Sequence, residues 1–123
     1  MMQDLTGLIR LWAEDKKLQN ASPNKQVIKL GEEFGELCQG MVKDNAVQVY
    51  DAIGDMYVVM TILCMQLGIS IEQCVAYAYD EIKNRNGAIH KGVFIKESDL
   101  VKINSENAID DLEQRGKGAK PWE

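Results

Sequence analysis

The amino-acid sequence predicts an all-α protein with a four-helix core, followed by a short C-terminal helix and tail. Apolar residues recur every three or four positions over most of the chain before residue 87, which is the spacing of one helix face. Proline, glycine and short polar turns interrupt this spacing. The chain has 123 residues, 46% of them hydrophobic, which suffices for one domain with a single core. We therefore expect helices at about residues 4–18, 23–43, 46–67 and 70–86.

The first helix is amphipathic. Five of its apolar residues follow the i, i+3, i+4 pattern, with the charged residues opposite: Leu5, Leu8, Ile9, Trp12 and Ala13. The loop that follows ends at Ser22 and Pro23. Serine can cap a helix and proline suits the first helical position, so a second helix should begin there.

The second helix carries an apolar seam suited to packing against an antiparallel neighbour. The seam consists of Val27, Leu30, Phe34, Leu37 and Met41. A polar stripe runs beside it and contains Gln26, Lys29, Glu33, Glu36 and Gly40. At about 100° per residue, the stripe spans roughly a quarter of a turn. Its two glutamates therefore lie at the edge of the seam, where they can face a cleft.

The third helix follows the polar turn Lys43-Asp44-Asn45 and is apolar on nearly every face after Asp55. Such a helix must be covered on several sides. The other helices of one small subunit do not provide enough cover, so we expect a dimer or a dimer of dimers. Gly54, next to Asp55, would let another backbone approach closely.

The fourth helix begins at a recognisable signal. Gly68 ends the third helix, and Ser70-Ile71-Glu72-Gln73 is typical of a capping box. Gly87 suits a left-handed residue at the end of the fourth helix, and a short extended or hairpin-like segment is predicted around Lys91-Gly92. Asn104 or Ser105 would cap the short C-terminal helix, from about Glu106 to Arg115.

Charge and cysteine content argue against several classes of protein. The net charge of −5 disfavours a nucleic-acid or anionic-membrane surface, since such binding needs a basic footprint. Cys38, Cys64 and Cys74 form no Cys-x-x-Cys pair, which disfavours a disulfide framework and a zinc site. The longest apolar run, Met56 to Met65, is too short to span a bilayer, and no signal peptide is evident. We expect a cytoplasmic protein.

Two carboxylate clusters point to function. Glu32, Glu33 and Glu36 fall in the second helix, and Asp51 and Asp55 in the third. Residues three or four apart share a helix face, so these like charges are forced together unless a cation neutralises them. Mg²⁺ suits carboxylate oxygens best, with Mn²⁺ as the alternative. Glutamates by themselves more often form a solvated helix face. Solvation does not readily explain the two aspartates, because they lie in the most apolar helix of the chain.

The two helices carry the motif Gln26-x-x-Lys29-Leu30-x-Glu32-Glu33-x-Gly35-Glu36-Leu37 and, after one turn, Asp51-x-x-Gly54-Asp55-Met56-Tyr57. This pattern resembles the MazG-like all-α nucleoside triphosphate pyrophosphohydrolases, whose signature is Glu-Glu-x-x-Glu, a turn, and Glu-x-x-Asp. The resemblance covers roughly residues 5–97. It implies a pyrophosphohydrolase domain at 1–97 and a tail at 98–123.

The resemblance assigns roles to the carboxylates. The implied catalytic residues are Glu32, Glu33 and Glu36, with Glu32 assisting or activating water. The implied metal ligands are Glu33, Glu36, Asp51 and Asp55. The family has glutamate three residues before the aspartate, where this chain has Ala52. Asp51, four residues before Asp55, points to the same side of a helix and can replace it, although its shorter reach would alter metal number or affinity.

The resemblance also implies substrate contacts: Lys29, Lys83, Asn84, Arg85 and Trp12. Basic residues near the end of the last core helix meet phosphates in the family, and Lys83 and Arg85 lie in that region. The alternative role for these two residues is to favour the helix dipole. Trp12 and Tyr57 would lie near the base, although aromatic residues on amphipathic helices are more often part of the core.

The implied reaction is Mg²⁺-dependent hydrolysis of nucleoside or deoxynucleoside triphosphates at the α–β bond, giving a nucleoside monophosphate and pyrophosphate. Three alternatives stay open. The chain could be a non-catalytic helical interaction or regulatory module of the same fold. It could also be a related enzyme acting on dUTP or dCTP, or on phosphoribosyl-ATP. A nucleophile-histidine site is disfavoured, because His90, the only histidine, has no nucleophile nearby in sequence.

Overall fold

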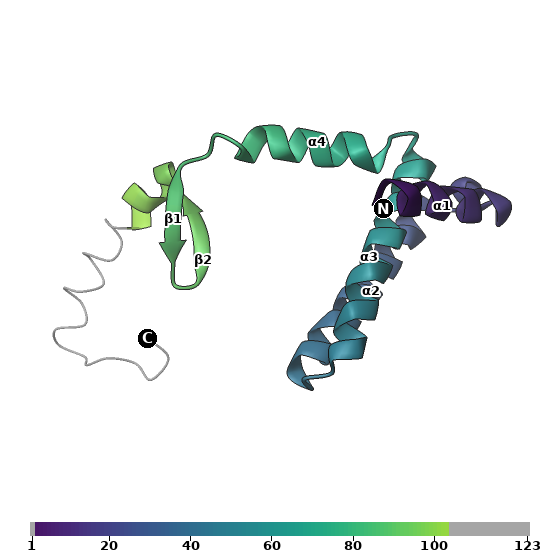
Figure 1. The fold of residues 1–123 in the computed structure, drawn as a ribbon, viewed down its shortest axis with the longest axis horizontal. Helices are drawn as coiled ribbons and strands as arrows, with labels where there is room; N and C mark the ends of the chain where they lie inside the picture. The colour runs from purple at the N-terminus through teal and green to yellow at the C-terminus, as the bar shows by residue number, and fades with distance from the viewer. Residues whose placement is uncertain (1, 104–123) are drawn as a thin grey trace. The chain divides into compact units, whose positions relative to one another are not determined.

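The computed structural model describes residues 2–103, and Figure 1 shows their fold. Four long helices account for most of these residues, so the predicted all-α class with a four-helix core is confirmed. In chain order the elements are α1 (Met2–Asp15), the 3₁₀ turn η1 (Leu18–Asn20), α2 (Pro23–Val42), α3 (Ala46–Leu67), α4 (Ile71–Ile82), β1 (Gly87–His90) and β2 (Val93–Lys96). Residues 97–103 are also helical. Two compact units divide between Tyr77 and Ala78.

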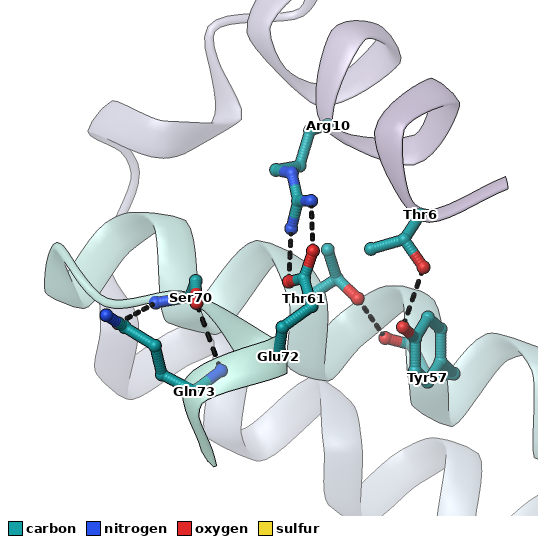
Figure 2. A network of polar contacts seen from close by, with 7 residues as sticks. All are labelled: Thr6, Arg10, Tyr57, Thr61, Ser70, Glu72 and Gln73. Carbon is teal, nitrogen blue, oxygen red and sulfur yellow. Dashed lines mark hydrogen bonds and ion pairs between the residues drawn. The ribbon is translucent and has the colours of Figure 1, made fainter. Parts of the chain in front are cut away.

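The predicted helix starts are confirmed. The side chain of Ser22 accepts a hydrogen bond from the Lys25 backbone N–H at 3.4 Å, with Pro23 in the first turn of α2. The Ser70 N–H donates to Gln73 Oε1 at 3.3 Å, and the Gln73 N–H donates to Ser70 Oγ at 3.1 Å (Figure 2). Gly68 ends α3 with φ 74°, the left-handed conformation expected of it.

Several element ends differ from the sequence prediction. The first helix stops at Asp15, because Lys17 adopts φ 59° and turns the chain into η1. The fourth helix stops at Ile82, one turn early. Gly87 is not left-handed; it opens β1, where a Cβ would collide with the Ile95 carbonyl, so glycine is needed there for close approach.

The second unit contains the predicted hairpin. Strands β1 and β2 are antiparallel, with Gly87 opposite Lys96 and His90 opposite Val93. Lys91 and Gly92 form the turn with φ 50° and 80°, as a two-residue hairpin loop requires. The predicted helix from Glu106 to Arg115 lies outside the described residues.

The first unit is organised around the hairpin of α2 and α3, which pack side by side along their lengths (Figure 1). Close approach is possible at Gly40, where a Cβ would lie 3.1 Å from Val49 Cγ2. Towards the other end of α2, the Gln26 side chain donates to the Val59 carbonyl at 3.2 Å. The polar stripe of α2 therefore faces α3.

This packing corrects the predicted seam. Val27, Phe34 and Met41 are 53%, 55% and 62% exposed, whereas Glu33 and Gly40 of the polar stripe are buried. The reason lies in the backbones: α3 approaches α2 closely at Gly40, which has no side chain, and the Gln26 amide of the stripe bonds to a backbone carbonyl of α3. Val27, Phe34 and Met41 of the apolar seam are therefore left facing outwards, while its other two residues, Leu30 and Leu37, are half-buried.

The same holds for α1, which lies against the C-terminal half of α3 (Figure 1). Its buried residues are Thr6 and Ala13, while Leu5, Leu8 and Trp12 are each more than half exposed. In α3, Val59, Thr61 and Ile62 are buried, but Tyr50 and Ile53 are exposed. One subunit thus leaves much of its predicted core uncovered.

By length and composition, α3 is the one helix among residues 2–103 that could cross a bilayer. The apolar run Met56 to Met65, from which the sequence prediction was made, omits the first ten residues of this helix. Core helices of soluble proteins have the same length and composition, so these two properties do not distinguish the two kinds of helix. The absence of a membrane partner stays a prediction.

Candidate metal centre

Three carboxylates from two helices converge. Glu33 and Glu36 lie one turn apart on α2, and Asp55 lies opposite them on α3. Each offers an oxygen, and these oxygens lie within 4.8 Å of one another. Oxygens on opposite sides of one Mg²⁺ are about 4 Å apart. Small side-chain rotations would therefore bring all three carboxylates into one coordination sphere.

Glu33 is the most constrained member of this cluster. The residue is only 8% exposed, and its Oε2 is buried without a hydrogen-bond partner. Its Oε1 lies 3.7 Å from the Nζ of Lys29, a side chain that is 55% exposed. A buried carboxylate oxygen without a partner is costly. A cation held by the cluster would supply the missing interaction, so the residues present fit a divalent metal ion.

The electrostatics of Asp55 point the same way. Burial is the largest cause that raises the pKa of its carboxyl, followed by the nearby charges of Asp51 and Glu33; Lys29 opposes them. A raised pKa means that the ionised form is disfavoured in the protein without metal. A bound cation would reverse this preference.

Two predicted carboxylates are not members of the converging trio. Glu32 and Asp51 are exposed, and Asp51 precedes Asp55 by one turn of α3. Asp51 is close enough to raise the pKa of Asp55. Ala52 is 1% exposed and belongs to the core. The roles of Glu32 in catalysis and of Asp51 as a ligand stay predictions.

A groove of about 580 Å³ lies beside the cluster, between α1 and α3. Asp51 and Asp55 line it together with apolar residues and two tyrosines, Tyr50 and Tyr57. The hydroxyls of Tyr57 and Thr6 share a hydrogen bond of 2.7 Å (Figure 2). The groove was not predicted, since it depends on how α1 crosses α3. Its size and lining suit an organic ligand held next to a metal ion.

The predicted substrate-binding residues fall in different places. Lys29 lies within the carboxylate cluster. Trp12 lines an adjoining hollow with Leu5, Leu8, Ile9 and Val58, and three of these residues also line the groove. The segment Lys83-Asn84-Arg85 follows α4 in the second unit, where Lys83 Nζ pairs with Asp80 at 2.8 Å. Contacts of these residues with substrate stay predictions.

One polar link in the first unit has no sequence signal. Arg10 of α1 donates two hydrogen bonds to the Glu72 carboxylate of α4, at 2.8 and 2.5 Å (Figure 2). The partners are 62 positions apart, so no local pattern could reveal them. The hydrogen bond from Arg10 lowers the pKa of Glu72 to about 2. This pair ties the first turn of α4 to α1.

Comparison with known proteins adds two matches. The family model described as phosphoribosyl-ATP pyrophosphohydrolase matches residues 13–86, a segment that contains all three converging carboxylates. A protein of Haemophilus phage HP1 (strain HP1c1), described as an uncharacterized 18.2 kDa protein in the rep-hol intergenic region, is 50% identical over 66 residues. That alignment covers 53% of this chain and 40% of the phage protein. No solved structure matches.

Proposed function

The chain belongs to the phosphoribosyl-ATP pyrophosphohydrolase family, and from this premise we propose that it hydrolyses nucleoside or deoxynucleoside triphosphates at the α–β bond with Mg²⁺. The products would be a nucleoside monophosphate and pyrophosphate. The observation that carries the proposal is the convergence of Glu33, Glu36 and Asp55, with one buried oxygen of Glu33 lacking a partner.

Each residue of the cluster has a part in this proposal. Glu33, Glu36 and Asp55 would hold the metal, which would neutralise phosphate oxygens and acidify a water molecule. Glu32, exposed on the same helix, would accept the proton of the attacking water. Lys29 compensates the charge of Glu33 in the metal-free protein. Once the carboxylates hold a cation, its ammonium group is available for a phosphate.

The groove beside the cluster supports a place for the nucleoside. Asp51 and Asp55 line it together with apolar residues and Tyr57, whose ring can stack on a base. Trp12 does not line this groove, so Tyr57 is the better candidate for base contact. The exposed apolar residues of α1, α2 and α3 support a dimer or a dimer of dimers.

A second candidate substrate is phosphoribosyl-ATP, which the family description names. Its triphosphate chain would meet the same carboxylates, and cleavage would again release pyrophosphate. The difference lies in the group attached at the base. Comparing turnover of the two kinds of substrate separates the candidates.

The test is an assay of the full chain with MgCl₂ and a panel of triphosphates that includes dUTP, dCTP and phosphoribosyl-ATP. Pyrophosphate release, abolished by EDTA and by Asp55→Asn, is the expected result. The matched control is Asp44→Asn, a carboxylate-to-amide change in the turn between α2 and α3 at φ 52°, which asparagine tolerates.

Two results would contradict the proposal. Release of orthophosphate in place of pyrophosphate would show cleavage at a different bond. If no substrate is hydrolysed and Mg²⁺ leaves the melting temperature unchanged, the chain is a non-catalytic module of this fold.

A further inference from the structure

Two of the three cysteines form a pair at the joint between α3 and α4. Their Sγ atoms are 4.0 Å apart, with Cys64 in the last turns of α3 and Cys74 in the first turns of α4. Cys64 is 8% exposed, whereas Cys74 is exposed to solvent. The sequence showed only that no Cys-x-x-Cys pair exists, because the nine residues between the two cysteines include the turn that brings the sulfurs together.

The joint that carries the pair is closely specified. Gly68 turns the chain in the left-handed conformation, and Ser70 and Gln73 cap α4 reciprocally. Arg10 then holds Glu72, two residues before Cys74, through two hydrogen bonds (Figure 2). The fold of the first unit therefore places the two sulfur atoms close together, and their distance is not set by the side-chain conformations of the two cysteines alone.

The two thiols differ in their exposure to solvent. Cys74 is accessible to a small oxidant in solution. Burial, followed by the neighbouring Cys74, raises the pKa of the Cys64 thiol, so Cys64 is the poorer nucleophile towards dissolved oxidants. Cys74 would react first, and Cys64, within reach, would then attack the oxidised sulfur.

We propose that Cys64 and Cys74 are an oxidation site, at which a hydroperoxide converts the two thiols into an intramolecular disulfide between α3 and α4. The Cys74 thiol takes one oxygen from the peroxide to form a sulfenic acid, and water leaves when the peroxide is hydrogen peroxide. The Cys64 thiol then displaces the sulfenic hydroxyl, which leaves as a second water. The peroxide is reduced and both thiols are oxidised. A thiol reductant reverses the reaction.

The test is oxidation of the full chain with hydrogen peroxide, followed by titration of free thiols and peptide mapping without reductant. The count should fall from three thiols to one, and dithiothreitol should restore it. Trypsin leaves both cysteines in one peptide, because no Lys or Arg lies between Lys43 and Lys83. Cleavage after Glu72 separates them, so a disulfide between Cys64 and Cys74 would hold two peptides together.

Matched variants make the result specific. Cys38→Ser removes the exposed cysteine of α2, and its two remaining thiols should still be lost together. Cys74→Ser, an exposed change, and Cys64→Ala, an apolar change in the core, should each abolish the intramolecular cross-link. The proposal is overturned if all three thiols survive, if Cys74 stops at sulfenic or sulfinic acid, or if cross-links involve Cys38 or join two chains.

Discussion

At the scale of single residues, Glu33 is buried with one carboxylate oxygen lacking a hydrogen-bond partner, and Glu36 and Asp55 lie beside it. Helical spacing was enough to place Glu33 beside Glu36, and the resemblance indicated Asp55. The burial of Glu33 and the exposure of Asp51 depend on which face of α2 meets α3. The link between Arg10 and Glu72 joins distant segments and could not be predicted at all.

Removing one charge from the cluster should stabilise the metal-free protein. Burial is the largest cause that raises the pKa of Asp55, and repulsion from Asp51 and Glu33 adds to it; Asp55→Asn removes the charge that is both buried and repelled. We expect the free energy of unfolding at pH 7 to rise by about 0.5 kcal/mol, as for like-charge neighbours on helices. Mg²⁺ should raise the melting temperature of the wild type but not that of the variant. Thermal unfolding with EDTA or MgCl₂ measures both effects, and a metal response retained by Asp55→Asn would contradict this assignment.

The ion pair between Arg10 and Glu72 predicts a pH dependence. The pKa of Glu72 is lowered from 4.5 to about 2, so its contribution to stability is complete above about pH 4.5 and is lost as the pH falls towards 2. The wild type should be more stable than Glu72→Gln at pH 7. The difference in their free energies of unfolding should shrink as the pH falls from about 4.5 towards 2. Urea unfolding at several pH values measures it. Asp44→Asn, the control, should show no such convergence.

At the scale of elements, helix starts were predictable and helix faces were not. Ser22, Gly68 and the Ser70-Gln73 box act through neighbours within four residues, so local sequence contains the information. The face of α2 that meets α3 depends on the contact of Gly40 with a helix that follows it. Apolar spacing alone predicted this face only in part, because it ignores where the backbones can approach: two residues of the seam are half-buried and three are exposed.

Two glycines of α2 test this account. Gly31 has open space where a Cβ would stand, so Gly31→Ala should raise the free energy of unfolding by about 0.5–1 kcal/mol through helix propensity. Gly40→Ala places the Cβ 3.1 Å from Val49 Cγ2 and should lose this gain or destabilise the protein. Chemical denaturation of both variants measures the difference. Equal stabilisation by the two changes would show that the helices do not meet closely at Gly40.

At the scale of the whole molecule, the uncovered apolar residues predict self-association. Val27, Phe34 and Met41 form an outward row on α2, and Leu5, Leu8 and Trp12 are exposed on α1. Soluble monomers seldom expose so many large apolar side chains on adjoining helices. The expectation of a partner subunit came from the apolar character of α3, and the exposure of α1 and α2 extends it to further surfaces.

We expect the protein to elute as a dimer or tetramer, with its mass measured by light scattering. The double change Phe34→Glu and Met41→Glu should shift it towards the monomer, because it places two charges on the outward row of α2. Lys25→Glu, on the first turn of α2 outside that row, serves as the control and should leave the mass unchanged. A wild-type protein that is monomeric at tens of micromolar would contradict the prediction.

The outward row on α2 has a consequence for how the protein would behave when scarce. The helix that supplies Glu33 and Glu36 is also the helix whose other side lacks cover. Subunit dissociation on dilution would therefore loosen the scaffold of the carboxylates themselves. We expect the turnover per molecule to decline below a threshold protein concentration. The number of copies in a cell, as well as the supply of metal, would then determine the activity of each molecule.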